Sequence, residues 1–531
     1  MKNENEREAI HFELPREYNA ASHFIDRHLK ENRQQKTAII DKNGSYSYQD
    51  LAEQVNRAGN ALRELGVQME TRVMLGMVDT IDFVTAFWGA IKIGAVPIPV
   101  NTLLTSQDYS YMLPDSRARV LIVSDILYEK FAPVLENAPF LETVLVSGED
   151  AKGHLHYGEK LASASSSLDP MPTTSDDVAC WLYSSGSTGA PKGVMHLQSS
   201  FEYVARTYGE RVLGIREDDI VYSAAKLFFA YGLGNSMTFP LHVGATTVLL
   251  DERPTPDSVL AVMKKHQTTV FFGVPTLYNA ILADQNNVRS TGSEKLRRCL
   301  SAGEALPEEV AKKWKIRFES EILDGIGSTE MMHIFLSNRE GDICYNSTGK
   351  AVPGYELKVV DEADRLLKPG EVGELLVRGS SAAMAYWNQR QKSINTFQGQ
   401  WTRTGDKYFV NDQGYYCYSG RTDDMLKISG IWVSPFEVET ALMNHEQVLE
   451  VAVIGVADEN ELIKPKAYIT LNDPSCASDT LVEELQQFVK DRLAPYKYPR
   501  WIEFIEELPK TATGKIQRFK LRAISKESAV D

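Results

Sequence analysis

The sequence alternates between helical spacing and short apolar runs from about residue 36 to residue 335. Leu51, Val55 and Leu62 recur at intervals typical of one helix face, and Gly66 is placed to end that helix. A second helix is expected over 83–93, and strands are expected at 72–78, 95–100, 120–123, 246–250 and 269–272. Strands that alternate with helices usually form parallel sheets covered on both faces. The pattern therefore predicts an α/β fold with two doubly wound sheets.

The remaining residues show two other patterns. After about Gly341, runs at 372–379 and 413–419 are typical of short strands joined by turns, which indicates a small β subdomain or barrel. From about Asp424, a helix over 435–443, strands over 448–456 and 466–471, and a helix over 480–493 indicate a small α+β domain. Because 531 residues exceed one ordinary core, we expect an N-terminal domain over 1–423 and a small separate C-terminal domain over 424–531.

Composition and charge exclude several classes of protein. A net charge of −15 argues against nucleic acid as the main partner, which would require a basic face. Residues 1–8 lack the apolar core of a secretory signal, and the apolar window 81–100 contains Asp82 and Lys92, which favours a buried helix and strand over a membrane span. Five widely spaced cysteines are typical of reduced thiols, so we expect a cytoplasmic protein without a zinc site. The basic stretch from Lys510 is either a polyphosphate-binding segment or a solvated tail.

The segment from Ser184 to Gly193 carries the strongest chemical signal. It contains four hydroxyl residues, three glycines and one lysine, directly after the apolar run 178–183. Glycines let the backbone approach a polyphosphate, amides and hydroxyls donate to its oxygens, and lysine adds a positive charge. A Walker A loop is excluded because Pro191 precedes Lys192 and Gly193 follows it. The segment is therefore a different phosphate loop or, less informatively, a surface turn.

Four further segments each have a functional and a structural interpretation. Thr329-Glu330 suits a phosphate oxygen and Mg²⁺, or caps a helix. Asp406 suits a ribose diol, or sits in a turn. Arg421 lies where the pattern of the sequence changes, and Lys515 is presented by a polar glycine loop over 509–516. Taken together and in this order, these segments are highly specific.

On these motifs the sequence resembles the acyl-adenylate-forming superfamily of acyl-CoA synthetases, adenylation domains and luciferases, from about residue 20 to residue 525. The resemblance implies that Asp406 and Arg421 hold the ribose of ATP and that Asp423 is the hinge of a mobile C-terminal domain. The catalytic residues that it implies are Lys515, Thr329 and Glu330. It also implies that Glu330 binds Mg²⁺ and that Lys427, Ser429 and Gly430 border the coenzyme A tunnel. Ile326 departs from the family pattern, since many members carry a tyrosine beside adenine there. The remaining residues that the resemblance implies for ATP binding are Ser184, Ser185, Gly186, Ser187, Thr188, Gly189, Lys192, Ser301, Ala302, Gly303, Glu304, Asp324, Gly325, Gly327, Ser328 and Thr329.

Two segments are similar to the benzoate-CoA ligase subgroup. They cover 228–235 and 331–335, and in that subgroup they line the carboxylate pocket. Aromatic and aliphatic side chains above a glycine suit a flat apolar ring, whereas His333 either faces substrate or has a structural role. The subgroup resemblance also suggests a homodimer. The expected pocket residues are Phe229, Ala230, Tyr231, Gly327, His333 and Ile334.

The resemblance implies an ATP-dependent, AMP-forming ligase that joins an aromatic carboxylate to coenzyme A, with Mg²⁺. A medium-chain fatty acyl-CoA synthetase on the same scaffold is the nearest competing function. The motifs also leave open an adenylation enzyme that loads a carrier protein, a luciferase-like oxygenase and a noncatalytic nucleotide-binding module. Neither a nucleic acid nor a membrane is expected as a partner.

Overall fold

The computed structural model describes residues 12–184, 191–422, 424–428, 431–458, 462–510 and 516–527. The chain forms two compact units, Met1–Leu357 with Val377–Thr402, and Lys358–Leu376 with Arg403–Asp531. The predicted boundary between residues 423 and 424 is a different kind of division, because it separates segments that are expected to move relative to each other. This boundary stays a prediction. No helix of the described residues is long and apolar enough to cross a membrane.

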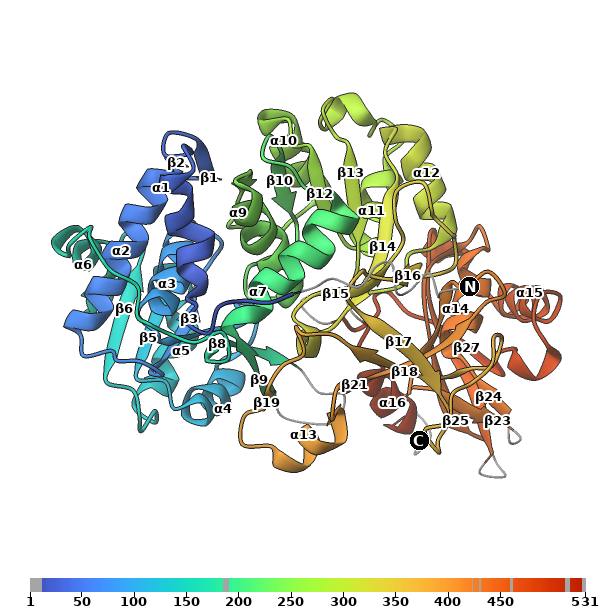
Figure 1. Ribbon diagram of the computed structural model, residues 1–531. Helices are drawn as coiled ribbons and strands as arrows, with labels where there is room; N and C mark the ends of the chain where they lie inside the picture. Colours follow the sequence, from blue (N-terminus) through green and yellow to red (C-terminus); the bar gives the residue numbers. More distant parts are fainter. Residues whose placement is uncertain are drawn as a thin grey trace, which may run out of the picture. The chain divides into compact units, whose positions relative to one another are not determined.

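A nine-stranded sheet forms the centre of the first unit, in the order β16-β15-β14-β13-β12-β10-β11-β1-β2. The strands from β14 to β1 run parallel, and β2, β15 and β16 add antiparallel edges. Figure 1 shows helices α10 to α12 beside the green and yellow strands of this sheet. The strands are β1 (Thr37–Asp41), β2 (Gly44–Ser47), β10 (Ile220–Ser223), β11 (Thr246–Val248), β12 (Val270–Gly273), β13 (Arg298–Ser301), β14 (Ile322–Gly327), β15 (Ile334–Ser337) and β16 (Lys350–Ala351), and the helices are α10 (Pro256–His266), α11 (Pro275–Ala283) and α12 (Glu308–Phe318).

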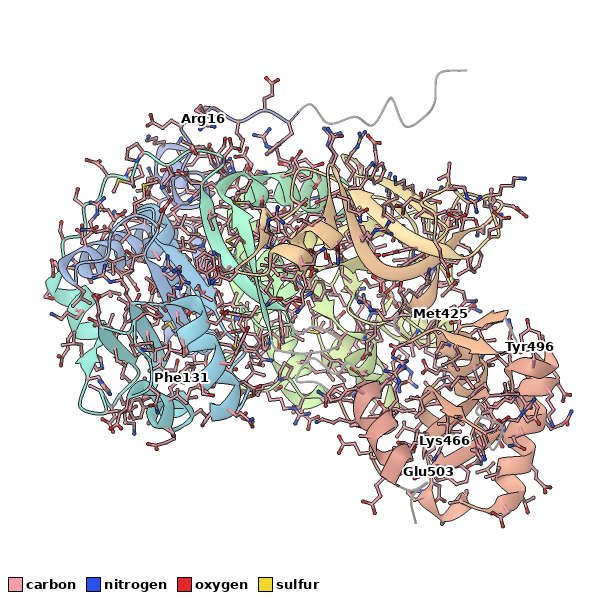
Figure 2. The ribbon with its side chains drawn as sticks, turned by 90° about the horizontal axis from the view of Figure 1, so that it is seen from below. Arg16, Phe131, Met425, Lys466, Tyr496 and Glu503 are labelled. Atoms are coloured by element: carbon pink, nitrogen blue, oxygen red, sulfur yellow. The ribbon has the colours of Figure 1, made fainter. Side chains whose placement is uncertain are left out.

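A second, five-stranded sheet has the order β4-β3-β5-β6-β7, and all its strands are parallel. Its helices pack closely. A Cβ at Gly89 of α3 would lie only 2.8 Å from the Cβ of Ala58 on α2. Phe131 of α5, which is labelled in Figure 2, stacks on Tyr109 of α4 with ring centroids 4.0 Å apart. The elements are β3 (Arg72–Gly76), β4 (Val96–Pro99), β5 (Val120–Ser124), β6 (Thr143–Ser147), β7 (Leu155–His156), α2 (Tyr48–Glu64), α3 (Ile81–Lys92), α4 (Ser106–Ser116), α5 (Tyr128–Leu135) and α6 (Tyr157–Ser163).

A small antiparallel sheet completes the first unit. It consists of β8 (Val178–Ser184), β9 (Lys192–Leu197) and β19 (Ala385–Tyr386), in the order β19-β9-β8. Trp181 of β8 and Trp387, just after β19, lie with ring centroids 4.6 Å apart. Helix α7 (Gln198–Val204) packs against β8 and β9, and α13 (Arg390–Thr396) packs against β19. The other short helices of the first unit are α8 (Ala230–Leu233), α9 (Phe239–Val243) and the π-helical segments Ala205–Leu213 and Gly234–Thr238.

The second unit begins with most of a five-stranded sheet and continues as α+β. In that sheet β17 (Glu356–Val360), β18 (Gly373–Arg378), β21 (Trp401–Val410) and β20 (Phe397–Gln398) follow one another, and β22 (Tyr416–Arg421) pairs with β21. On the neighbouring strands β26 and β27, Lys466 lies 2.8 Å from Glu503 (Figure 2). The α+β part contains β23 (Leu426–Ile428), β24 (Ile431–Val433), α14 (Pro435–Met443), β25 (Val448–Ala457), β26 (Ile463–Leu471), α15 (Asp479–Lys490), β27 (Trp501–Phe504) and α16 (Arg518–Glu527).

The predicted α/β class is confirmed, as is the α+β pattern after residue 424. Helix α14 has the predicted bounds, and the predicted strand over 448–456 is β25. The five cysteines are free, as expected for reduced thiols. The apolar window 81–100 forms the buried helix α3 and the strand β4.

Candidate active site

Strands β8 and β9 form the two arms of the predicted phosphate loop. They pair antiparallel, with Tyr183 opposite Gly193 and Ser184 opposite Lys192. A Cβ at Gly193 would lie 3.3 Å from Cε3 of Trp181 and 3.4 Å from Cβ of Trp387, so a larger residue would crowd both side chains. The hairpin brings the first hydroxyl residue and the lysine of the motif face to face. Ser185, Gly186, Ser187, Thr188 and Gly189 lie outside the described residues.

The loop lysine and the predicted magnesium carboxylate lie together. Lys192 Nζ is 3.7 Å from Glu330 Oε1, and both side chains are largely buried. The same carboxylate oxygen accepts a hydrogen bond of 2.8 Å from the hydroxyl of Tyr386, whose ring centroid is 4.3 Å from Lys192 Nζ. Two motifs that are far apart in the sequence therefore meet at one carboxylate, with a tyrosine between them.

His196 contacts the backbone of the same Thr-Glu pair. Lys192 and His196 both belong to β9, and His196 Nε2 lies 2.8 Å from the carbonyl oxygen of Thr329. Burial lowers the pKa of His196 to about 4, so the ring is neutral and its Nε2–H donates to that carbonyl. Thr329–Met331 forms one short 3-10 turn, and Ser328 before it makes no capping bond through its side chain. The structure therefore does not support the helix-capping interpretation of this motif.

The predicted adenine wall is assembled by two neighbouring parallel strands. Ser301 at the end of β13 pairs in register with Asp324 of β14. Residues 302–304 and 325–328 continue from this pair at the carboxyl ends of the strands, where open α/β sheets usually bind ligands. Burial holds the pKa of Asp324 well above its usual range. The predicted ATP residues on these two strands are thus neighbours in the first unit.

His333 is held at the centre of the predicted carboxylate pocket residues. Its Nε2 lies 3.1 Å from Asn235 Oδ1 and 3.2 Å from the carbonyl oxygen of Tyr231. Rings of Tyr208 and Phe239 surround it, at centroid distances of 5.5 and 4.5 Å. Burial lowers its pKa to about 3, so the imidazole is neutral at physiological pH. Its Nδ1 is buried and has no hydrogen-bond partner among the described residues.

The other predicted pocket residues lie on short elements, and Tyr231 and Gly327 are close to His333. Tyr231 lies in α8, with Phe229 just before that helix, and Tyr231 donates to the carbonyl oxygen of Gly273 at 3.3 Å. Gly327 is paired with Ile334 across β14 and β15. A Cβ at Gly327 would lie 2.5 Å from the carbonyl oxygen of His333, so this close approach requires glycine. The structure therefore brings both predicted pocket segments together.

Asp79, which the sequence did not single out, anchors the first of these segments. Its two carboxylate oxygens lie 3.2 and 3.3 Å from the backbone nitrogen of Leu227, and Lys226 Nζ is 4.0 Å away. Burial raises the pKa of Asp79 to about 6. A Cβ at Gly232 would lie 2.0 Å from the carbonyl oxygen of Lys226, so the segment folds tightly back on itself. The chain that leads into Phe228–Tyr231 is thus fixed at both ends.

The predicted ribose pair lies in the second unit. Asp406 of β21 and Arg421 of β22 are opposite each other, and the Arg421 guanidinium donates to Asp406 Oδ1 at 2.9 Å. Arg421 also donates to the carbonyl oxygen of Thr404 at 3.1 Å. Asp406 is nearly buried, which holds its carboxylate in one orientation.

Ion pairs organise the part of the second unit around the predicted hinge and catalytic loop. Arg518 of α16 makes a two-bond contact with Glu439, at 2.7 and 2.8 Å, and Arg522 bonds to Asp424 at 2.5 Å. Lys510 pairs with Glu450 at 2.6 Å, and Lys510 and Ile516 form an isolated antiparallel bridge. These three basic residues are engaged within the unit, which favours a structural role over a polyphosphate site for them. Lys427 lies in β23, whereas Asp423, Ser429, Gly430 and Lys515 lie outside the described residues.

Comparison with known proteins identifies the class. The model of the AMP-binding enzyme family matches residues 25–387, and that of the AMP-binding enzyme C-terminal domain matches residues 437–515. The chain belongs to the AMP-binding enzyme family.

Several individual relatives within this family are CoA ligases that act on aromatic acids, according to their names. The chain is 56% identical to benzoate–CoA ligase of Thauera aromatica, over 96% of this chain and 97% of that protein. It is 49% identical to 4-hydroxybenzoate–CoA/benzoate–CoA ligase of Rhodopseudomonas palustris, over 96% and 95% of the two chains. Among solved structures, a benzoate CoA ligase from Burkholderia xenovorans LB400 matches with a TM-score of 0.89 at 49% identity, covering 95% of this chain and 100% of that one. The anthranilate CoA ligase AuaEII matches with a TM-score of 0.93 at 43% identity, covering 98% and 99%.

Proposed function

We propose that this protein is an ATP-dependent, AMP-forming ligase that converts benzoate, or a close aromatic analogue, to its coenzyme A thioester through an acyl-adenylate. The observation that carries the proposal is the 56% identity to a benzoate–CoA ligase over nearly the whole of both chains. The neutral imidazole of His333 and the aromatic rings beside it support an apolar ring as substrate.

In the first step a carboxylate oxygen attacks the α-phosphorus of ATP, and pyrophosphate leaves. The protein contributes mainly by positioning and by stabilising charge. We assign Lys192 to the phosphates of ATP. Its position at the end of the phosphate loop, 3.7 Å from Glu330, supports this assignment. We assign Asp406 and Arg421 to the ribose, and Lys515 to the two anions that must approach each other, the carboxylate and the α-phosphate.

Magnesium fits the Thr329-Glu330 turn by its donor chemistry. Mg²⁺ prefers oxygen ligands and is usually held by one or two carboxylates together with substrate phosphates. Glu330 supplies a carboxylate beside a cationic residue that also suits phosphate, and Thr329 supplies a hydroxyl. When bound, the ion would offset negative charge between the phosphates of ATP.

In the second step the coenzyme A thiolate attacks the acyl carbon of the mixed anhydride, and AMP leaves. We assign the hinge between the two conformations to Asp423, so that residues 1–423 and 424–531 move as separate domains. Lys427, Ser429 and Gly430 are assigned to the coenzyme A side. The ion pairs of Asp424 with α16 support this assignment, because they tie the residue after the hinge to the C-terminal helix.

Several narrower assignments belong to the same proposal. Phe229, Ala230, Tyr231, Gly327, His333 and Ile334 line the carboxylate pocket, with His333 as a neutral residue. Adenine lies along 301–304 and 324–328, with Ile326 in place of an aromatic residue. A homodimer and a cytoplasmic location also remain proposals, which rest on the subgroup resemblance and on the pattern of the sequence.

The test is AMP formation by the full chain with ATP, Mg²⁺ and coenzyme A, with one carboxylate at a time. Benzoate, 2-aminobenzoate, 4-hydroxybenzoate and octanoate are compared by kcat/KM. The proposal expects an aromatic acid to be preferred over octanoate. Preference for octanoate would overturn the aryl assignment but leave the adenylating mechanism standing. Absence of AMP formation with all four acids would count against the ligase assignment itself.

A further inference from the structure

We propose that Tyr386 is a positioning residue that sets the orientation of Glu330 and Lys192 for the magnesium complex of ATP. This inference deepens the proposed function and rests on it. Tyr386 does not belong to any of the motifs described in the sequence analysis. It has also not been given a role in the proposed function.

Two charged groups meet at the Tyr386 side chain. Its hydroxyl donates to Glu330 Oε1 at 2.8 Å, and Lys192 Nζ lies 3.7 Å from that same oxygen. The ammonium group also lies 4.3 Å from the centroid of the tyrosine ring, within the range of a cation–π interaction. One residue therefore contacts both charges of the Lys192–Glu330 pair through two different parts of its side chain.

The backbone around Tyr386 binds the Thr-Glu turn at further points. Ala383 N donates to the carbonyl oxygen of Glu330 at 2.8 Å, and Ser381 Oγ donates to that of Met331 at 2.9 Å. With the tyrosine hydroxyl, the segment 381–386 thus makes bonds to both the main chain and the side chain of the turn. The turn cannot shift without breaking several of them.

Tyr386 is itself fixed from the opposite side. It belongs to β19, where it pairs with Val194 of β9, the strand that begins at Lys192. Its backbone nitrogen also donates to Ser393 Oγ at 3.0 Å, which ties the strand to helix α13. The residue is only 4% exposed. Tyr386 therefore joins the phosphate loop strand to the Thr-Glu turn, in addition to the contact that His196 of β9 makes with Thr329.

The consequence for Glu330 is directional. A carboxylate has two oxygens with lone pairs, and both Tyr386 and Lys192 engage Oε1. These two contacts hold the carboxylate in one orientation. Oε2 is therefore held in one direction, in which it can bind a metal ion without a change of rotamer. The cation–π contact with the Tyr386 ring keeps the Lys192 ammonium group near the phosphate loop. Lys192 therefore does not need a short ion pair with Glu330 to stay in this position.

The experiment removes the hydroxyl alone. In Tyr386→Phe the ring remains to pack against its neighbours, but the hydrogen bond to Glu330 is lost. Binding of ATP to the full chain is measured by calorimetry over a series of Mg²⁺ concentrations, and AMP formation from benzoate is measured over the same series. We expect the Mg²⁺ concentration for half-maximal response to rise about tenfold in both assays, in line with the loss of a hydrogen bond to a charged group. The KM for benzoate and the melting temperature should stay close to the parent values.

Tyr109→Phe is the matched control, because it also removes a buried hydroxyl, one that donates to the carbonyl oxygen of Asn101 at 2.6 Å. It should leave the magnesium dependence unchanged. Tyr386→Leu removes the ring as well and should weaken nucleotide binding further; if it does not fold, Tyr386→Phe carries the test alone. An unchanged magnesium dependence in a folded Tyr386→Phe would overturn the inference and assign Tyr386 to packing. Failure of the parent chain to form AMP would instead defeat the proposed function, while the calorimetric binding still tests Tyr386.

Discussion

The imidazole of His333 rests directly on the backbone of Gly234. A Cβ at Gly234 would lie 2.2 Å from Cδ2 of His333, a distance that no ordinary contact allows. The ring is also held through Nε2 by Asn235 and Tyr231, so it has little room to move away. The glycine therefore determines where the buried imidazole of the proposed pocket can lie.

Replacing Gly234 by alanine should displace His333 and disturb the pocket. Overpacking of this kind typically costs about 1–3 kcal/mol of stability. We expect a lower melting temperature and a raised KM for benzoate, with the KM for ATP nearly unchanged. In the Gly234→Ala/His333→Ala double variant the clash is absent, so the loss due to alanine at 234 should shrink. Strict additivity of the two single effects would contradict this account.

The stability of the protein should fall on mild acidification because several histidines are buried as neutral rings. Burial lowers the pKa to about 2 for His23, to about 4 for His28 and His196, and to about 3 for His333. Their contribution is complete above the ordinary histidine pKa near 6.5 and is lost as the pH falls below it, since the unfolded chain binds protons first. A group lowered to about 4 loses about 2 kcal/mol at pH 5.

Denaturant unfolding at pH 7.5, 6.0 and 5.0 measures this dependence. In His196→Gln the side chain keeps a donor for the Thr329 carbonyl but no longer titrates. The decline in unfolding free energy between pH 7.5 and 5.0 should therefore be smaller in this variant. An equal decline in both proteins would show that His196 does not take up a proton on unfolding.

Asp79 should matter as a hydrogen-bond acceptor and not as a charge. Its carboxylate accepts from Leu227 N, and its pKa is raised to about 6 by burial. The stability linked to this raised pKa is present at acidic pH and is lost as the pH rises through about 6, so ionisation is costly at pH 8. Asp79→Asn keeps an acceptor without that cost and should be at least as stable as the parent at pH 8.

Asp79→Ala, by contrast, leaves Leu227 N buried without its acceptor, which typically costs about 1–3 kcal/mol. Because Leu227 leads into the proposed pocket segment, the KM for benzoate should rise several-fold more than the KM for ATP. Thermal melts and the two KM values together check the prediction. Equal behaviour of the alanine and asparagine variants would refute it.

Lys515→Ala should strongly slow adenylation while leaving the second step intact. Loss of one well-placed donor typically costs about 3–4 kcal/mol in the transition state, or two to three orders of magnitude in rate. Adenylation is followed by benzoate-dependent pyrophosphate exchange, and the second step by thioester formation from preformed benzoyl-AMP. Lys510→Ala is the control, because Lys510 pairs with Glu450 and has no assigned role in adenylation, so pyrophosphate exchange should stay near the parent value. Near-parental exchange in Lys515→Ala would remove this residue from the mechanism.

Asp423→Pro should show the opposite pattern. Restricting the backbone at the proposed hinge impairs the change between conformations more than either conformation alone. Thioester formation from benzoyl-AMP should therefore fall more than pyrophosphate exchange. Equal losses in the two half-reactions would argue against a hinge at this position.

Local sequence patterns predicted the elements of this fold well. The helix expected over 435–443 is α14, and the strands expected near residues 72, 96 and 120 are β3, β4 and β5. Periodicity reports which face of a segment is buried, and that is decided by residues a few positions apart. Strand order in the nine-stranded sheet did not follow from such patterns, because it depends on pairings between distant segments.

The motifs of the site could be predicted from the sequence because the residues of each motif lie close together in the chain. Their supporting residues were not visible. His196 lies 133 positions from Thr329, Leu227 lies 148 from Asp79, and Tyr386 lies 56 from Glu330. No local spacing relates such pairs, so a lone tyrosine, histidine or aspartate carried no signal.

The amino-acid sequence by itself thus determined the α/β class, the family and the residues whose types suit ATP and a carboxylate. The tertiary structure alone decided which of them touch: Lys192 with Glu330, Gly234 with His333, and Asp406 with Arg421. The physical reason is one of range. Side-chain type and helical or strand periodicity act over a few residues, whereas the distance between two charges is set by how the sheets and turns that carry them pack.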